Sequence, residues 1–112
     1  MSMTAQQAGT FMRAFGDGTR LRIIAALGVR PLTVGELARL VRCPVQRMSR
    51  HLRYLYARGV VDWKPAGKAV AYRLSPPAHA LHRRVLAAVG ECLTTLGDVQ
   101  RDAGRLRAKP RR

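Results

Sequence analysis

Two short amphipathic helices separated by one proline constrain this sequence more than any other feature. Thr33 and Glu36 have the spacing of a capping box, in which a hydroxyl and a carboxylate three residues later accept each other's backbone N–H groups, so a helix is predicted to begin directly after Thr33. That helix must end before Pro44, which has no N–H to donate. A second helix is predicted over residues 45–58, before Gly59. The sequence therefore predicts a helix-turn-helix pair.

The second helix of this pair is apolar on one face only. When its residues are placed ~100° apart, one stripe holds the large apolar side chains. These are Val45, Met48, Leu52, Leu55 and Tyr56. The opposite face and its flanks carry side chains that form hydrogen bonds, namely Gln46, Arg47, Ser49, Arg50, His51, Arg53 and Tyr54. We expect the stripe to pack on a core and the polar face to meet a partner.

A basic β-hairpin is predicted after this helix. Residues 60–63 and 70–74 are rich in β-branched and aromatic side chains, and they flank a turn that contains Pro65 and Gly67. The basic side chains around this turn are Lys64, Lys68 and Arg73. A helix-turn-helix followed by a basic hairpin is the layout of a winged helix-turn-helix, whose second helix lies in the DNA major groove.

Further helices are predicted on both sides of this unit. The first carries Phe11 and Phe15, and Asp17 is placed to cap the second. Ser75 and Pro76 are expected to supply the cap of a long last helix that runs from Leu81 to about Val99. The expected fold is mainly α with a small β-hairpin. Residues 1–102 would form one DNA-binding and dimerisation domain, and residues 103–112 a basic, disordered tail.

The last predicted helix also carries a pattern that is typical of pairing between helices. Its apolar residues follow alternating spacings of four and three, as in a helix–helix seam. They are Val85, Val89, Cys92, Leu96 and Val99. Together with Phe11 and Phe15 of the first helix, we expect them to form the interface of a twofold homodimer.

The charge of the chain indicates a polyanionic partner. The 112 residues carry 21 Lys and Arg against 6 Asp and Glu, a formal net charge of +15, and residues 39–73 hold nine of the basic residues and one acid. No apolar run is long enough for a membrane span and no signal-peptide pattern occurs. We therefore expect a cytoplasmic protein whose polyanionic partner is double-stranded DNA and not a membrane surface. The alternative is a non-specific nucleic-acid-organising protein, which the net charge alone would also support.

Enzyme chemistry has no support in the sequence. There is no pair of carboxylates at catalytic spacing, no nucleophile motif and no phosphate-binding glycine loop. We therefore do not expect an enzyme.

Several stretches resemble the ArsR family of bacterial repressors. They are residues 15–24 (FGDGTRLRII), 35–38 (GELA), 49–55 (SRHLRYL), 59–61 (GVV) and 72–74 (YRL). The resemblance implies a dimeric winged helix-turn-helix repressor that leaves its promoter when a metal ion or a thiol modification favours another conformation.

The residues available for sensing depart from this family's pattern. Thr33 and Gly35 occupy the positions of its Cys-x-Cys metal site, so that site is absent. The last helix offers His79, His82, Glu91, Cys92, Asp98 and Asp102, whose spacing does not match the family's second metal site. We therefore expect no metal cofactor, and we expect the two histidines to be exposed polar residues. The alternative is that His79 and His82, three residues apart, bind a zinc ion between two subunits.

The two cysteines have separate interpretations. We expect Cys43 to be part of the core. Cys92 is either a small apolar filler of the dimer seam or a thiol that senses oxidants or persulfide.

Overall fold

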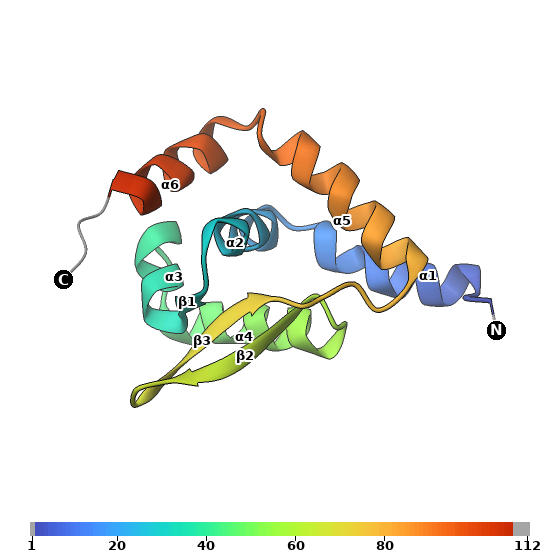
Figure 1. The fold of residues 1–112 in the computed structure, drawn as a ribbon, viewed down its shortest axis with the longest axis horizontal. Coiled ribbons are helices and arrows are strands. Elements are labelled where there is room, and N and C mark those ends of the chain that lie inside the picture. The colour runs from blue at the N-terminus through green and yellow to red at the C-terminus, as the bar shows by residue number, and fades with distance from the viewer. Residues whose placement is uncertain (1, 109–112) are drawn as a thin grey trace.

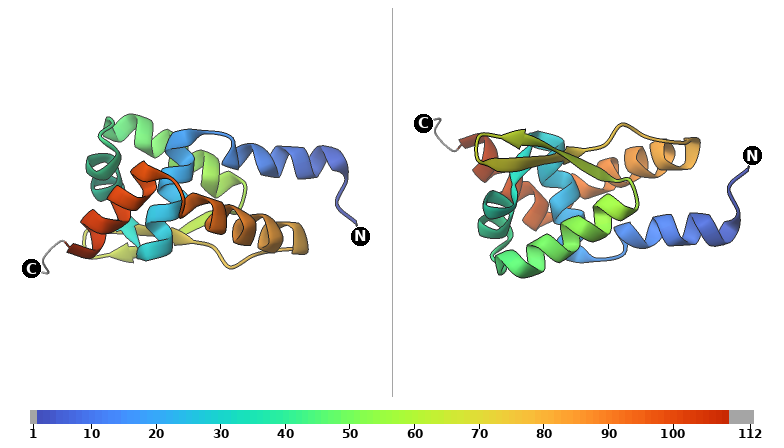
Figure 2. Two further views of the ribbon diagram at one scale, coloured as in Figure 1. Left: turned by 90° about the horizontal axis from the view of Figure 1, so that it is seen from above. Right: turned by 90° about the horizontal axis from the view of Figure 1, so that it is seen from below.

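The computed structural model describes residues 2–108, which form helices around a small antiparallel sheet (Figure 1). In chain order the elements are α1 (Ala5–Met12), the 3-10 turn η1 (Arg13–Phe15), α2 (Gly18–Val29), β1 (Leu32–Thr33), α3 (Val34–Val41), α4 (Val45–Ala57), β2 (Val61–Ala66), β3 (Ala69–Leu74), α5 (Ala80–Leu93) and α6 (Gly97–Ala108). Helix α2 lies at the centre, α5 and α6 arch over one side of it, and α4 lies with the hairpin on the other side (Figures 1 and 2). This is a winged helix-turn-helix fold, as predicted.

The predicted caps determine where α2 and α3 begin. Together with α4, these helices are called the reading unit below. The backbone N–H of Glu36 donates to Thr33 Oγ1 at 3.2 Å, and the N–H of Thr33 donates to Glu36 Oε1 at 2.9 Å. The N–H of Arg20 donates to Asp17 Oδ2 at 3.1 Å, so Asp17 caps α2. Helix α3 ends at Arg42, whose φ of 63° is left-handed and turns the chain toward α4. Local hydrogen bonds thus fix the helix-turn-helix geometry.

The sheet has three strands, one more than the two-stranded hairpin that the sequence predicted. Strands β2 and β3 pair with Trp63 opposite Tyr72, and Gly67 takes a φ of 65° in the turn between them. The short strand β1 then pairs with β3, with Leu32 opposite Tyr72, which gives the sheet order β1-β3-β2. This third strand ties the wing to the segment that precedes α3.

One hydrophobic core supports the reading unit. Met48, Leu52 and Leu55 of α4 are fully buried, and they join core residues of α2 and α3 such as Ile23 and Leu37. The ends of the predicted stripe differ from its middle, because Val45 and Tyr56 are 48% and 51% exposed. Burial of the central three residues holds α4 with its polar face outward.

The long final helix that we expected begins where it was predicted but ends early. It begins at Ala80, one residue before the predicted start at Leu81, but its N-cap is His79 rather than Ser75, and His79 Nδ1 accepts the N–H of His82 at 3.0 Å. It ends at Leu93, where the hydroxyls of Thr94 and Thr95 donate back to preceding carbonyl oxygens, each at 2.7 Å. The chain therefore turns before Gly97 and returns as a separate helix, α6.

The expected disordered tail is also wrong for the residues that the structure describes. Helix α6 crosses the predicted boundary at residue 102 and continues to Ala108. Asp102 is 2% exposed and ion-paired with Arg22 of α2, while Leu106 packs on the core. These contacts with α2 and the core stabilise the helix. Residues 109–112 of the predicted tail lie outside the described residues.

Candidate nucleic-acid interface

The polar face of α4 is open to solvent and strongly basic. Gln46, Arg47, Arg50 and Arg53 are exposed, whereas Ser49 is half-buried. None of the ion pairs within residues 2–108 includes an arginine of this face. Three guanidinium groups are therefore available to phosphates or to the edges of guanine bases.

His51 lies beside these arginines and is half-buried. Burial lowers the pKa of its imidazole, and the positive charges of Arg20, Arg47 and Arg50 lower it further, against the opposing effect of Asp17. At neutral pH His51 is therefore an uncharged hydrogen-bonding group within a cationic surface.

The structure places Tyr54 away from the open face. Its ring is packed by two guanidinium groups, with the Arg58 Cζ 3.6 Å and the Arg20 Cζ 4.2 Å from the ring centroid. Arg20 also donates through Nε to the carbonyl oxygen of Ala14 at 3.0 Å. Tyr54 thus anchors α4 to the start of α2.

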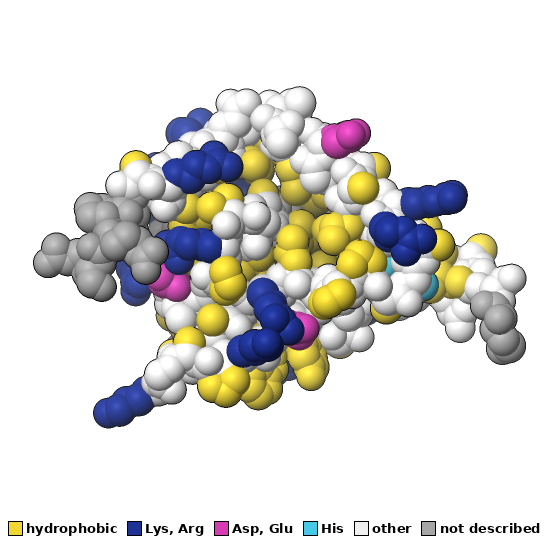
Figure 3. Space-filling view, in the orientation of Figure 1, with side chains coloured by type: hydrophobic (Ala, Val, Ile, Leu, Met, Phe, Trp, Pro, Cys, Tyr) yellow, Lys and Arg dark blue, Asp and Glu magenta, His cyan; other side chains and the backbone are white. Residues whose placement is uncertain are grey.

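The hairpin carries fewer available charges than its sequence suggests. Lys64 and Lys68 are exposed, but Arg73 donates to Asp62 across the two strands, with Nε 2.6 Å from Oδ1. This pairing with Asp62 raises the pKa of Arg73 and partly neutralises its charge. Figure 3 shows basic side chains on the hairpin, which projects away from the body of the protein.

An aromatic hollow between α4 and the wing was not expected from the sequence. It encloses 330 Å³ and is lined by Ser49, Leu52, Arg53, Tyr56, Trp63 and Tyr72. Trp63 is 46% exposed. The signal that could have found it was the alternation along β2, which places Trp63 on the same sheet face as the opposing Tyr72.

The residues predicted for a continuous dimer seam do not share one face. Phe11 is 5% exposed, and its ring packs on Phe15 and on His79 and His82 within the protomer. Val99 is buried, Val85 and Val89 are half-buried, and Cys92 and Leu96 are exposed. The break between α5 and α6 separates the last two positions from the others. The unbroken seam that the spacing predicted is therefore interrupted between α5 and α6.

The histidines and cysteines have different surroundings. His82 is 1% exposed, contrary to the expectation, and its Nδ1 accepts the N–H of Ala78 at 3.2 Å. Burial lowers the pKa of this imidazole. Cys43 is half-buried against the core and Cys92 is exposed. Within the described part of the chain, no three His, Cys, Asp or Glu side chains are grouped to hold a metal ion.

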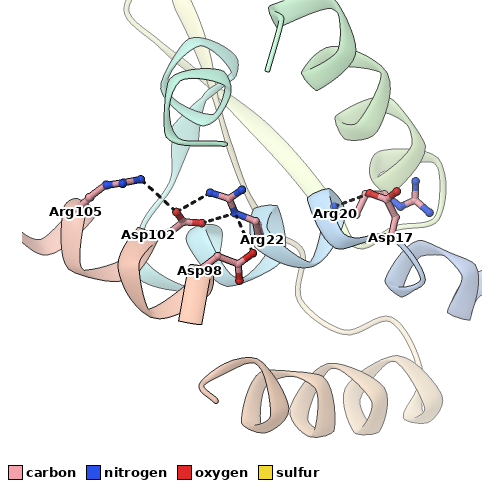
Figure 4. Close-up of polar contacts among 6 residues, drawn as sticks. All are labelled: Asp17, Arg20, Arg22, Asp98, Asp102 and Arg105. Atoms are coloured by element: carbon pink, nitrogen blue, oxygen red, sulfur yellow. Dashed lines mark hydrogen bonds and ion pairs between the residues drawn. The ribbon is translucent and has the colours of Figure 1, made fainter. Parts of the chain in front are cut away.

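Helix α6 is fastened to α2 by a buried ion pair (Figure 4). Arg22 donates to both carboxylate oxygens of Asp102, at 2.8 and 2.9 Å, and Asp98 lies 4.0 Å from the same guanidinium. The pairing with Asp102 raises the pKa of Arg22. This clasp connects the last helix to α2 of the reading unit.

Comparison with known proteins agrees with this geometry. Residues 15–62 match a helix-turn-helix domain family. The chain is 39% identical over 71 residues to the transcriptional regulator Rv2034 of Mycobacterium tuberculosis, covering 63% of this chain and 66% of that protein. It is 37% identical over 82 residues to the transcriptional repressor SmtB of the same organism, covering 73% of this chain and 59% of the repressor. The matches thus span between half and two thirds of these relatives.

Solved structures share the fold across most of the chain. HlyU from Vibrio cholerae superposes with a TM-score of 0.69 at 25% identity, covering 85% of this chain and 97% of HlyU. The homodimeric winged helix-turn-helix DNA-binding domain of Mb0332 from Mycobacterium bovis gives a TM-score of 0.64 at 24% identity, covering 82% and 86% of the two chains. No helix within residues 2–108 is both long and apolar enough to span a membrane.

Proposed function

Because this chain belongs to the ArsR family of DNA-binding transcriptional regulators, we propose that it is a repressor that binds an inverted-repeat operator as a homodimer and leaves it on a signal. The observation that carries this proposal is the exposed face of α4, whose arginines take part in none of the ion pairs among residues 2–108. A helix held by a buried stripe and presenting unpaired basic groups suits the major groove.

The roles of the individual groups follow from their chemistry. Arg47 and Arg50 have the donor geometry to pair with O6 and N7 of guanine, and Gln46 can pair with adenine. Ser49 suits a phosphate oxygen. Tyr56 and Trp63 border this face with large exposed rings, which are suited to apolar contact with thymine methyl groups or sugars.

The wing adds contacts beside the groove. Lys64 and Lys68 are the exposed lysines of the hairpin, and both favour phosphates or the minor groove. Arg73 contributes less because its ion pair with Asp62 partly neutralises its charge.

The homodimer rests on exposed apolar groups near α1 and α5. Met12 is 49% exposed and Leu96 is 41% exposed. Helix α5 lies on the side of α2 opposite to α4 and the hairpin (Figure 1), whereas Figure 2 shows α1 on the same side as α4, so a twofold contact centred on α5 leaves both reading helices free. Two such helices related by a twofold axis would read half-sites about 34–36 Å apart. The homodimeric state of the Mb0332 domain supports a homodimer.

The proposed signal acts on the thiol of Cys92. Its thiol is exposed on α5, where oxidation or persulfide formation would change the proposed interface. Operator affinity measured before and after peroxide or polysulfide tests this, with Cys92→Ser as the control. Equal affinity in all states would refute it.

A site-selection and gel-shift experiment tests the proposed function. The protein is allowed to select sequences from random duplexes, and its affinity for the selected site is then compared with scrambled DNA at physiological salt. A repressor prefers an inverted repeat by ~10³-fold or more. A non-specific organiser of nucleic acid, which the charge of +15 would also support, selects no site.

A further inference from the structure

The side of the molecule opposite to the DNA-facing helix contains an apolar cavity. It lies between α2, α5 and α6, reaches the end of β3 at Leu74 and has a volume of 480 Å³. This size is within the ~300–1,000 Å³ range of small-molecule sites in proteins. Figure 3 looks into the hollow, where hydrophobic side chains gather beneath the arch of α5 and α6.

The lining defines the chemistry of an occupant. Among the described residues that line the cavity, the apolar ones are Ile24, Ala25, Val29, Leu74, Leu86, Leu93, Val99 and Ala103. Two polar groups there are already bonded within the chain, because Gln100 Nε2 donates to the Thr94 carbonyl oxygen at 2.8 Å and the Thr94 hydroxyl donates to that of Glu91 at 2.7 Å. The body of a ligand must therefore be apolar.

One charged residue remains in this lining. Arg107 of α6 is exposed and is absent from the ion pairs formed among residues 2–108, and none of the described lining residues is acidic. A single guanidinium beside an apolar hollow favours a ligand with one anionic group, and its planar fork matches a carboxylate.

We infer that this cavity binds a small amphipathic monoanion, such as a medium-chain fatty acid or an aromatic carboxylate. The carboxylate pairs with Arg107 and the apolar body lies between α5 and α2. The clasp from Arg22 to Asp102 holds α6 in place and so maintains the far wall.

The position of the cavity gives the ligand a route to the reading unit. Ile24 and Val29 belong to α2, which packs on α3 and α4, and Leu74 is the last residue of the wing strand β3. If the protein is the repressor proposed above, the ligand also regulates it. A ligand that separates α5 from α2 changes the affinity of the protein for its operator, and operator binding changes the affinity for the ligand by the same factor.

Two glycines of the cavity lining have open space where a side chain would begin. Gly90 and Gly28 line it, and a Cβ added at either position meets no atom within 4 Å. Because Gly90 lines the cavity, we expect the side chain of Gly90→Leu to occupy part of it, and leucine also favours the helical conformation of α5 more than glycine does. Gly104→Leu is the matched control, because Gly104 is also helical and open but does not line the cavity.

Calorimetry with sodium octanoate and with 1-octanol tests the site on the full chain without DNA. Octanoate is expected to bind, with affinity rising about three- to fourfold for each methylene from hexanoate onward. Gly90→Leu should weaken both ligands at least tenfold, and Gly104→Leu neither. Arg107→Gln should weaken octanoate about fivefold or more and leave octanol unchanged, with Arg101→Gln as the control for a charge elsewhere on α6.

The outcomes separate this inference from the proposed function. If a selected operator is bound specifically but octanoate and octanol bind neither wild type nor control, the cavity proposal is overturned while the repressor proposal stands. If Gly90→Leu changes the monomer–dimer equilibrium and leaves octanoate affinity unchanged, the hollow is an interface between copies and the proposal is wrong. Octanoate binding with no site selection would support the cavity and refute the repressor.

Discussion

The ion pair between Arg22 and Asp102 makes a quantitative prediction about the stability of the last helix. The Arg22 side chain is 23% exposed and the Asp102 side chain 2%, so this is a nearly buried bidentate pair between α2 and α6. Removing one partner of such a pair costs ~3–5 kcal/mol. Because Arg22 keeps some contact with water and has Asp98 at 4.0 Å, we expect Asp102→Asn to cost ~2–3 kcal/mol.

The matched control lies one turn away on the same helix. Asp98 is 45% exposed, so Asp98→Asn should cost less than about 1 kcal/mol. At ~4 °C per kcal/mol for a domain of this size, Asp102→Asn should lower Tm by about 8–12 °C. The double variant Arg22→Met with Asp102→Leu should regain most of this loss, because it leaves no buried charge unpaired.

Urea denaturation and thermal melts at one fixed protein concentration measure these differences, since dimerisation makes Tm concentration-dependent. Hydrogen exchange of the backbone amides of α6 should also be faster in Asp102→Asn than in Asp98→Asn. Equal stability of the Asp102→Asn and Asp98→Asn variants would refute the reasoning that the clasp holds α6 on α2.

Three further predictions follow from the core, the histidines and the wing. Leu52 is fully buried in α4, so Leu52→Ala should cost ~2–5 kcal/mol in urea denaturation, and a cost below about 1 kcal/mol would contradict its place in the core. Burial lowers the pKa of both His82 and His51, so the stability contributed by their neutral forms is present above the unfolded pKa of about 6.5 and is lost as pH falls below it. His82→Leu should flatten this part of the profile, and an unchanged slope would count against it. Lys64→Ala and Lys68→Ala should each make the negative slope of the logarithm of the DNA-binding constant against the logarithm of salt concentration shallower by ~1, without changing sequence preference. An unaltered slope would show that these lysines do not contact DNA.

The sequence predicted the features that depend on neighbouring residues. The Thr33 capping box, the Asp17 cap and the extent of α4 each arise from groups within a few positions of one another. The hairpin was predicted for the same reason, because its turn and alternation are local. These elements form the frame of the candidate interface.

The features that were missed depend on contacts distant in the chain or on competing hydrogen bonds. Asp102 pairs with Arg22 across 80 positions, and this contact helps to order a basic segment expected to be disordered. The break after Leu93 follows from threonine hydroxyls that bond to the preceding turn, a preference that the apolar spacing alone does not reveal. The packing of Tyr54 between Arg20 and Arg58 likewise needs two helices to be placed first.

The contribution of Arg50 to base-pair discrimination is the most direct test of the central claim, that α4 reads DNA through its exposed basic face. Affinities of wild type and Arg50→Ala would be measured for the selected operator and for operators changed one base pair at a time. We predict that Arg50→Ala loses ~1–3 kcal/mol on the operator and relaxes preference at one position of each half-site. Undiminished discrimination at every position would contradict this assignment of the reading helix.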